Sequence, residues 1–280
     1  MSIILLLGLF NAAHCNIYID IALSNENQSA KVSVNGCDRD LITNEEQKSF
    51  CLTPDDVTND LNRIGLPPPN HIYVQKTSHF GYRDIFTILK PLTATITNFT
   101  KKPVVLYNKT FINHGETPEK YKMGMHEERL ERMIVRWNTE KELSLGREIM
   151  IHFADRKVFR SAWNKRETKL WDSKMASRSD VEFSLAPGEN ATVITTALRA
   201  QLQLKIDYVA ILDGDLYFLR TIFFIPIKQK AMDVNLYFYV IGVSGLVSGY
   251  QTIILDFYFA GQVNVQDGNG KMIMDPVPFH

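Results

Sequence analysis

The stretch from Ala191 to Leu212 reads ATVITTALRAQLQLKIDYVAIL, and it decides the fold class. Its apolar side chains fall on alternate positions, namely Ile194, Leu198, Ala200, Leu202, Leu204, Ile206 and Tyr208. Charged and amide side chains fill the positions between them: Arg199, Gln201, Gln203, Lys205 and Asp207. A period of two is typical of a strand with one buried face, and a helix does not satisfy it. About 18 residues in one strand would span roughly 60 Å, against a usual strand length of five or six residues.

The chain after this stretch continues in the same manner. Alternation or β-favouring composition predicts further strands over Leu216–Pro226, Val234–Val243, Gln251–Ala260, Val263–Val265 and Lys271–Met274. Asp267-Gly268-Asn269-Gly270 has the composition of a hairpin turn. We therefore expect a mainly β protein, elongated and mostly antiparallel, with long strands.

Val234 to Leu255 contains no charged residue, which is a charge-free run of membrane-span length. Three glycines and several aromatic residues of high β propensity interrupt the run. We interpret it as two core strands joined through Ser244 and Gly245 rather than as a transmembrane helix.

The segment before Pro91 has a different character. Asn16–Ala22 and Lys31–Val34 alternate like short strands. Thr53-Pro54-Asp55-Asp56 has the pattern of a capping box with proline at the first helical position, and Gly65 follows where a helix end is expected. We expect a helix over about Pro54–Ile64, within a small α+β N-terminal lobe (16–90) that precedes the long-stranded domain (91–280).

The first 15 residues resemble a secretory signal peptide. Ile3–Phe10 is apolar but too short to span a bilayer, and Ala13 and Cys15 stand at the −3 and −1 positions of a cleavage site. The alternative is a buried N-terminal strand. Cleavage would make the protein secreted, with a mature chain that starts near Asn16.

Two further features fit an extracellular protein. Cys37 and Cys51 would be the two cysteines of the mature chain, and an even number in an oxidising compartment predicts a disulfide; two buried thiols are the alternative. Glycosylation sequons begin at Asn27, Asn98, Asn108 and Asn190. Together with a signal peptide, these four sequons predict a glycoprotein.

Composition excludes several classes of function. The 280 residues carry 31 basic and 31 acidic side chains, so the net charge is zero and the chain is not a dedicated nucleic-acid binder. No histidine is paired at metal-ligand spacing, and Asp213-Gly214-Asp215 is ordinary turn chemistry. We expect no catalytic residues, no metal and no cofactor, and therefore no enzyme.

The segment of about 140–175 has the pattern of a membrane hairpin. Leu143, Leu145, Ile149, Ile151 and Phe153 share one face of a predicted strand, and the chain from Val158 to Trp171 could return beside it. An arm of about eleven residues with one apolar face suits a membrane-crossing strand. Trp163 and Trp171 would lie near the headgroups.

Charge complicates this prediction. Arg147 interrupts the apolar face, and the return arm contributes to a basic patch composed of Arg156, Lys157, Arg160, Lys165, Arg166 and Lys169. Arg or Lys facing lipid at the midplane costs about 2–4 kcal/mol. The alternatives are a solvated hairpin that lies along the body, or pairing of the basic stretch with the acidic N-terminal lobe, where residues 16–62 hold nine acids against three bases.

The chain resembles the aerolysin-type β-pore-forming superfamily, with its epsilon-toxin and mosquitocidal branch. The resemblance rests on Thr97–Thr100 with Pro103, on Ile134–Thr139 before the hairpin, and on Leu185-Ala186-Pro187-Gly188 before the long strand. Within the superfamily the chain looks still more like the non-toxin relatives, namely the spherulin-like proteins and the follicular-epithelium yolk proteins of insects. Toxins of this superfamily carry a Ser/Thr-rich insertion hairpin with few charges, which this chain does not share.

The resemblance implies a secreted, non-enzymatic, membrane-interacting protein that forms homo-oligomers and pores. Its partners would be membrane lipid or a cell-surface receptor. The alternative is a yolk, egg or extracellular structural protein that keeps the fold without forming pores. A third hypothesis is a glycan- or lipid-binding module with its pocket in Asn16–Lys90.

Overall fold

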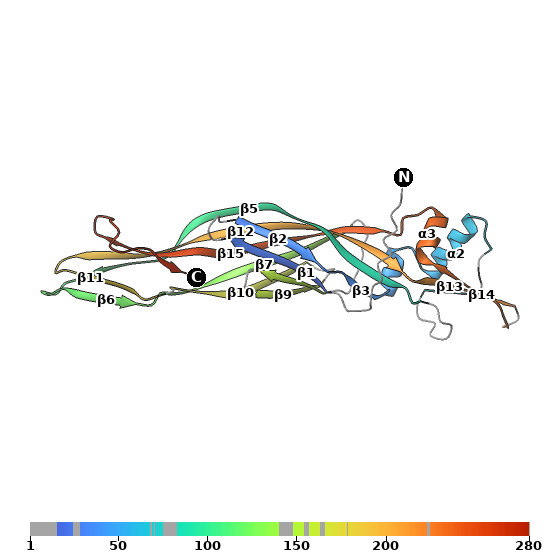
Figure 1. Ribbon diagram of the computed structural model, residues 1–280, viewed down its shortest axis with the longest axis horizontal. Coiled ribbons are helices and arrows are strands. Elements are labelled where there is room, and N and C mark those ends of the chain that lie inside the picture. Colours follow the sequence, from blue (N-terminus) through green and yellow to red (C-terminus); the bar gives the residue numbers. More distant parts are fainter. Residues whose placement is uncertain are drawn as a thin grey trace.

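The computed structural model describes residues 16–24, 29–67, 69, 71–74, 83–139, 148–153, 157–162, 166–177, 179–222 and 225–279. The molecule is an elongated rod of long strands (Figure 1). The helices are α1 (Asn44–Ser49), α2 (Pro54–Arg63) and α3 (Val234–Ile241). α2 and α3 lie together near one end of the rod, and the long strands extend from there toward the other end. The predicted mainly β, antiparallel, long-stranded architecture is confirmed.

The central sheet runs along most of the rod, up to the end that holds α2 and α3 (Figure 1). Its strand order is β10-β7-β15-β12-β5-β3, every neighbouring pair is antiparallel, and β16 pairs with β15. The strands are β3 (Asp38–Leu41), β5 (Phe86–Ile112), β7 (His126–Thr139), β10 (Glu167–Ala176), β12 (Asn190–Asp213), β15 (Val247–Asp267) and β16 (Val277–Phe279). The predicted long strand is β12, with 24 residues, and it lies between β5 and β15.

Three smaller sheets complete the rod. One has the order β2-β1-β8-β9 and contains β1 (Ile17–Ser24), β2 (Ser29–Asn35), β8 (Glu148–Phe153) and β9 (Lys157–Ala162). A second pairs β6 (Glu119–Met123) with β11 (Val181–Leu185). The third has the order β14-β13-β4 and contains β4 (His71–Tyr73), β13 (Asp215–Ile222) and β14 (Ile225–Asp233). Segment 16–90 therefore contributes both to the middle of the rod, through β1 and β2, and to the helical end.

The buried side changes along β12. Its buried side chains occupy even positions from Ala200 to Leu212 and odd positions from Ala191 to Ala197. Because successive residues of a strand point to opposite faces, the two buried sets lie on opposite faces of one sheet. Ile194 and Leu198 do lie on the even-numbered face, as expected, but they are only half-buried because that face is not fully covered there.

The neighbours of β12 adapt to this change. Thr196 faces Gln262 and Leu198 faces Phe259, so β15 has one residue more than β12 at this point. The extra residue lies at Ala260, whose φ is 51°. Gly261 follows, and a Cβ there would lie 2.4 Å from the carbonyl oxygen of Phe279. Glycine is required at 261 because β16 approaches the backbone of β15 so closely.

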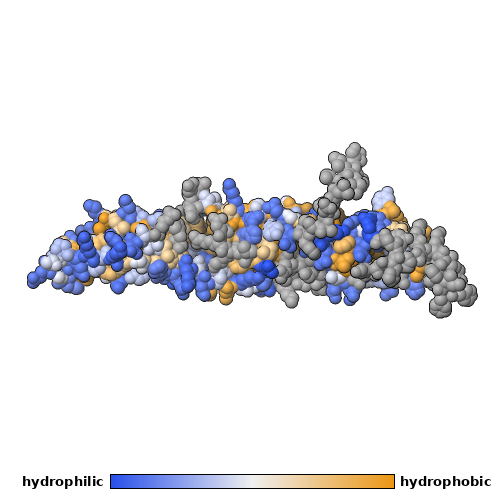
Figure 2. Space-filling model, turned by 60° about the horizontal axis from the view of Figure 1, so that its bottom comes forward, coloured by the Kyte–Doolittle hydropathy of each residue, from blue (hydrophilic) through white to orange (hydrophobic). Residues whose placement is uncertain are grey.

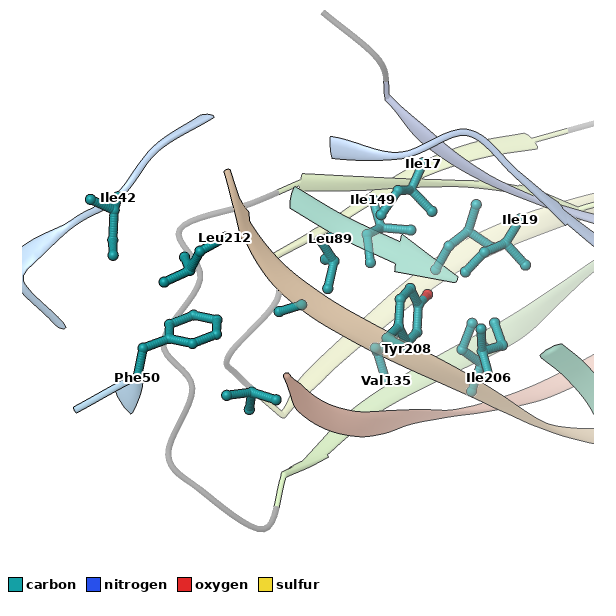
Figure 3. Close-up of a cluster of buried hydrophobic side chains, with 14 of the residues drawn as sticks. Ile17, Ile19, Ile42, Phe50, Leu89, Val135, Ile149, Ile206, Tyr208 and Leu212 are labelled. Carbon is teal, nitrogen blue, oxygen red and sulfur yellow. The ribbon is translucent and has the colours of Figure 1, made fainter. Parts of the chain in front are cut away.

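Two hydrophobic cores result. The larger core joins the even-numbered face of β12 to β1, β7, β8 and the helical end (Figure 3). Within it the Tyr208 hydroxyl donates to Gln251 Oε1 over 3.0 Å, and burial raises the pKa of Tyr208. The smaller core gathers Val193 and Ala197 with β11, the end of β15 and Phe279.

The predicted helix is present as α2. Thr53 and Asp56 form the expected capping box, with the Asp56 amide donating to Thr53 Oγ1 over 3.2 Å. Gly65 follows the helix at a φ of 76°.

The strand predicted over Val234–Val243 is wrong, because this segment forms α3. Asp233 caps the helix by accepting from the amides of Asn235 and Leu236, and Gly242 ends it in the left-handed region. The buried residues Val234, Tyr237, Phe238 and Ile241 follow helical spacing. Only the second strand of the predicted pair exists, as the beginning of β15.

The predicted disulfide is not formed in the structure. Cys37 lies between β2 and β3, whereas Cys51 lies between α1 and α2 with its side chain exposed. The two cysteines belong to separate parts of the fold, because β3 and α1 intervene and tie the chain to β5 and the helical end.

The change of buried face predicts unequal effects of two leucine truncations on the same strand. Leu204→Ala removes a fully buried side chain and should lower the free energy of unfolding by about 3 kcal/mol. Leu198→Ala removes a half-buried one, so its effect should be about 1 kcal/mol. Urea denaturation measures both; equal losses would contradict the assignment of faces.

Candidate membrane-insertion hairpin

β8 and β9 form the hairpin that sequence analysis placed at the membrane, and we call these two strands the insertion hairpin. Their register pairs Met150 with Arg160 and Ile151 with Phe159. β8 follows β7 along the chain and β9 precedes β10, while β7 and β10 pair with each other in the central sheet. In the sequence, the hairpin is thus flanked by two strands that pair with each other.

The register gathers four large apolar side chains on one face of the hairpin. Residues directly opposite each other on an antiparallel pair share a face. Phe159 therefore lies on the face of Ile151, together with Ile149 and Phe153, whereas Arg160 lies on the face of Met150 and His152. For these described side chains, one face is hydrophobic and the other carries the charge.

The hydrophobic face is buried in the larger core. Ile149 and Ile151 are fully buried, and the exposed fraction of Phe153 is 6%. The ring of Phe153 meets that of Phe257 on β15 edge-on, with 4.9 Å between centroids. The hairpin lies along the body, as one alternative anticipated, but its apolar face is packed against the central sheet rather than solvated.

β1 covers the remaining edge of β8. It pairs parallel to β8 from Ile17–Ile149 to Ile21–Phe153. Within this ladder, His152 Nδ1 lies 2.8 Å from Asp20 Oδ1. The isoleucines of β1 and the apolar residues of β8 enter the same core (Figure 3).

The return arm is shorter than the predicted run from Val158 to Trp171. β9 ends at Ala162, and Trp171 belongs to β10, which pairs with β7 instead of β8. The Trp171 indole donates to Glu131 Oε2 over 2.7 Å, and Glu131 Oε1 accepts from the amide of Tyr258 over 2.9 Å. Trp171 is thus half-buried in the body, where its ring lies 4.8 Å from that of Phe159.

Several predicted hairpin residues lie outside the described residues: Leu143, Leu145, Arg156, Trp163 and Lys165. Lys157 is described by its backbone pairing with Phe153. Arg160 and Arg166 are exposed, and the Lys169 ammonium donates to the carbonyl of Arg160 and lies 3.2 Å from Glu167 Oε1. The described part of the basic patch therefore lies on β9 and at the start of β10.

The sequons lie mostly on the two longest strands. Asn98 and Asn108 are exposed on β5, and Asn190 is exposed at the start of β12. Asn27 lies outside the described residues. The three described asparagines are therefore placed where a glycan could project into solvent.

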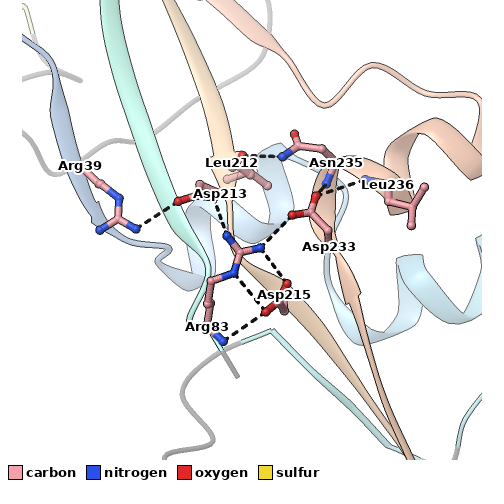
Figure 4. A network of polar contacts seen from close by, with 8 residues as sticks. All are labelled: Arg39, Arg83, Leu212, Asp213, Asp215, Asp233, Asn235 and Leu236. Atoms are coloured by element: carbon pink, nitrogen blue, oxygen red, sulfur yellow. Dashed lines mark hydrogen bonds and ion pairs between the residues drawn. The ribbon is translucent and has the colours of Figure 1, made fainter. Parts of the chain in front are cut away.

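The turn Asp213-Gly214-Asp215 at the helical end has a structural role, because its carboxylates bind Arg83. Gly214 has a φ of 139°, and the guanidinium of Arg83 lies 3.3 Å from Asp213, 3.0 Å from Asp215 and 2.9 Å from Asp233 (Figure 4). These hydrogen bonds, foremost that to Asp215, raise the pKa of Arg83. Within the described ranges, no three His, Cys, Asp or Glu side chains are grouped so as to hold a metal ion.

An exposed apolar patch on α3 and the residues after it was not predicted from the sequence. Its members are Leu236, Tyr239, Val240, Val243 and Leu246, and Tyr239 is 82% exposed. All five residues belong to the charge-free run that begins at Val234, and this run is the feature of the sequence that could have indicated the patch. Figure 2 shows hydrophobic residues along the middle and toward the helical end of one face, while the opposite tip is hydrophilic. Among the described residues, no helix is both long enough and apolar enough to cross a membrane.

The hydrogen bond between Trp171 and Glu131 should be measurable. Trp171→Phe keeps an aromatic ring beside Phe159 but leaves the buried Glu131 carboxylate without one donor, so the free energy of unfolding should fall by about 1–3 kcal/mol. The control is Leu170→Ala on the same strand, whose side chain is 58% exposed and whose effect should stay within about 0.5 kcal/mol. Similar losses in both variants, measured in urea, would argue against a special role for the indole N–H.

Comparison with known proteins gives distant relatives and a clear fold. No family model matches the chain. U-megalopygitoxin(8)-Mo12 of Megalopyge opercularis is 22% identical over 265 residues, covering 87% of this chain and 89% of the relative. U-megalopygitoxin(8)-Mc8 of Megalopyge crispata is 22% identical over 199 residues, covering 67% and 69%.

Among solved structures, the parasporin-2 toxin of Bacillus thuringiensis, described as recognising cancer cells, superposes with a TM-score of 0.55. The alignment covers 82% of this chain and 98% of parasporin-2, at 13% sequence identity. The resemblance stated from the sequence is thus confirmed at the level of architecture: the chain has the fold of the aerolysin-like β-pore-forming toxins.

Proposed function

We propose that the protein is a secreted, non-enzymatic pore-forming protein that assembles into homo-oligomers and inserts the insertion hairpin of each copy into a membrane. The observation that carries the proposal is the register of β8 and β9, which places Ile149, Ile151, Phe153 and Phe159 on one face and Arg160, with Met150 and His152, on the other. The toxin names of its relatives and the fold that it shares with parasporin-2 support the same function.

The position of Arg160 answers, for this residue alone, the objection that the hairpin is too charged for lipid; Arg147 still interrupts the apolar face of the first arm, and Lys157 pairs with Phe153. A strand in a membrane pore has one face toward lipid and one toward the aqueous lumen. With Ile149, Ile151, Phe153 and Phe159 toward lipid, Arg160 would face the lumen with His152. There its charge costs little and contributes to ion selectivity.

The arms must lengthen on insertion. β8 and β9 have six residues each, whereas a membrane-crossing strand needs about 9–11. Leu143 and Leu145 continue the odd-numbered apolar set in the sequence, so residues between β7 and β8 would extend the first arm. Extension would convert β7, β8, β9 and β10 into one long two-stranded ribbon.

Insertion also requires a change of packing. Burying one large aliphatic or aromatic side chain stabilises by roughly 1.5–3 kcal/mol, so removing Ile149, Ile151 and Phe153 from the core is unfavourable in water. Lipid offers these side chains an equivalent apolar environment. A membrane or a receptor at its surface would therefore favour the inserted state, whereas in solution the hairpin of the monomer would stay packed against the central sheet.

A storage or extracellular structural role is the second candidate. It is favoured by Arg147, Lys165, Arg166 and Lys169, which make the segment richer in charge than a pore hairpin needs. In that case the hairpin would remain docked permanently and the exposed sequons would serve solubility.

Dye release from vesicles tests the proposal. The purified protein, intact and protease-trimmed, is added to vesicles of phosphatidylcholine with phosphatidylserine, and to live cells in case a receptor is needed. Release together with a detergent-resistant oligomer is the expected result. Failure to release dye or to permeabilise cells in either form would favour the structural role.

Site-specific labelling identifies the inserting segment. In a background with the native cysteines replaced by serine, Phe159→Cys carries an environment-sensitive dye on the face of β9 that would meet lipid. The matched control is Val105→Cys, which is 61% exposed on β5. We expect vesicles to change the emission of the label at 159 and to leave that at 105 unchanged; equal responses would point to adsorption of the whole protein.

A further inference from the structure

We propose that β1 occupies, in the monomer, the edge of β8 that β9 of a second copy takes in the assembled pore. The inference rests on the proposed function and specifies the partner of one strand edge. It makes the N-terminal hairpin formed by β1 and β2 a competitor of assembly, because one edge of a strand can pair with only one neighbour at a time.

The two edges of the insertion hairpin differ. β8 is paired along both edges, with β9 on one side and β1 on the other. β9 is the last strand of its sheet, and within the part of the chain that the structure describes no strand pairs with its outer edge. One edge of the hairpin is therefore open and the other is closed by β1.

In a closed ring of hairpins, the outer edge of β8 and the outer edge of β9 must both pair with a neighbouring copy. In lipid every backbone N–H and C=O must be paired, so each β8 must pair with β9 of the adjacent copy. That pairing is antiparallel, whereas the pairing of β8 with β1 is parallel and slightly less stable per residue. Exchange of β1 for the neighbouring β9 thus replaces a weaker ladder with a stronger one.

Side-chain contacts show what holds β1 in place. Asp20 and His152 are 2.8 Å apart, and the rings of Tyr18 and His152 are 5.5 Å apart. A Cβ on Gly36 would lie 2.1 Å from the carbonyl oxygen of Asn16, so the end of β2 closely contacts the start of β1. β1 and β2 also pair over seven residues, from Tyr18–Asn35 to Ser24–Ser29. We infer that β1 and β2 leave β8 together as one hairpin.

A reversible crosslink tests the exchange. Asp20 and His152 are aligned in the parallel ladder and are both partly exposed, so Asp20→Cys with His152→Cys can form a disulfide without removing a core side chain. The other cysteines are replaced by serine. We expect the oxidised protein to release no dye above background and to form no oligomer, and reduction to restore both.

The matched control crosslinks β1 to β2 instead of β8. Asp20→Cys with Ser33→Cys joins aligned residues of the antiparallel pair and leaves the edge of β8 untied. This variant should release dye equally well when oxidised and when reduced. Dye release by the oxidised 20–152 variant would overturn the proposal.

Hydrogen exchange in solution separates this inference from pore formation itself. If β8 opens by loss of β1, oxidation of the 20–152 variant should slow amide exchange in both strands, whereas the 20–33 crosslink should leave β8 unchanged. If the wild-type protein forms no pores but this exchange pattern is found, only the proposed function fails. Unchanged exchange of β8 on oxidation at 20–152 would contradict the role of β1 even for an active pore former.

Discussion

The regular, unbroken backbone of β12 is the constraint on which the structure depends. It is paired along nearly its whole length by β5 on one edge and β15 on the other, and the counts of residues show that the extra residues at every register shift belong to those neighbours. A strand paired on both edges cannot change its alternation without breaking two ladders. Both hydrophobic cores are therefore arranged around the fixed direction of the β12 side chains.

The insertion hairpin follows from this arrangement. The larger core ends where the buried side chains of β12 change face, and the even-numbered residues from Ala200 onward leave an apolar surface to be covered. β1 and β8 supply that cover with side chains that alternate in the same way. Residues suited to lipid are thus needed in solution as well, because they complete the core of the monomer.

Much of this architecture was predictable because it depends on local patterns. Alternation identified β12, and the capping box with Gly65 identified α2 almost to the residue. α3 was missed because a charge-free run satisfies a buried strand as well as a helix, and its cap, Asp233, stands at the end of a strand. In the hairpin, the sequence predicted which residues share the apolar face only for the first arm, β8. The partner of Trp171 did not, because pairing of β10 with β7 is a long-range choice that no local spacing encodes.

The change of buried face along β12 has a consequence for cooperativity. The two cores lie on opposite faces of β12, and the backbone ladders of β5, β12 and β15, together with that of β7 and β10, pass from one core to the other. The backbone ladders are therefore the structural connection between the helical end and the distal tip. The rod can therefore rearrange around its larger core while the smaller core, with β6, β11 and β16, keeps the three long strands in register.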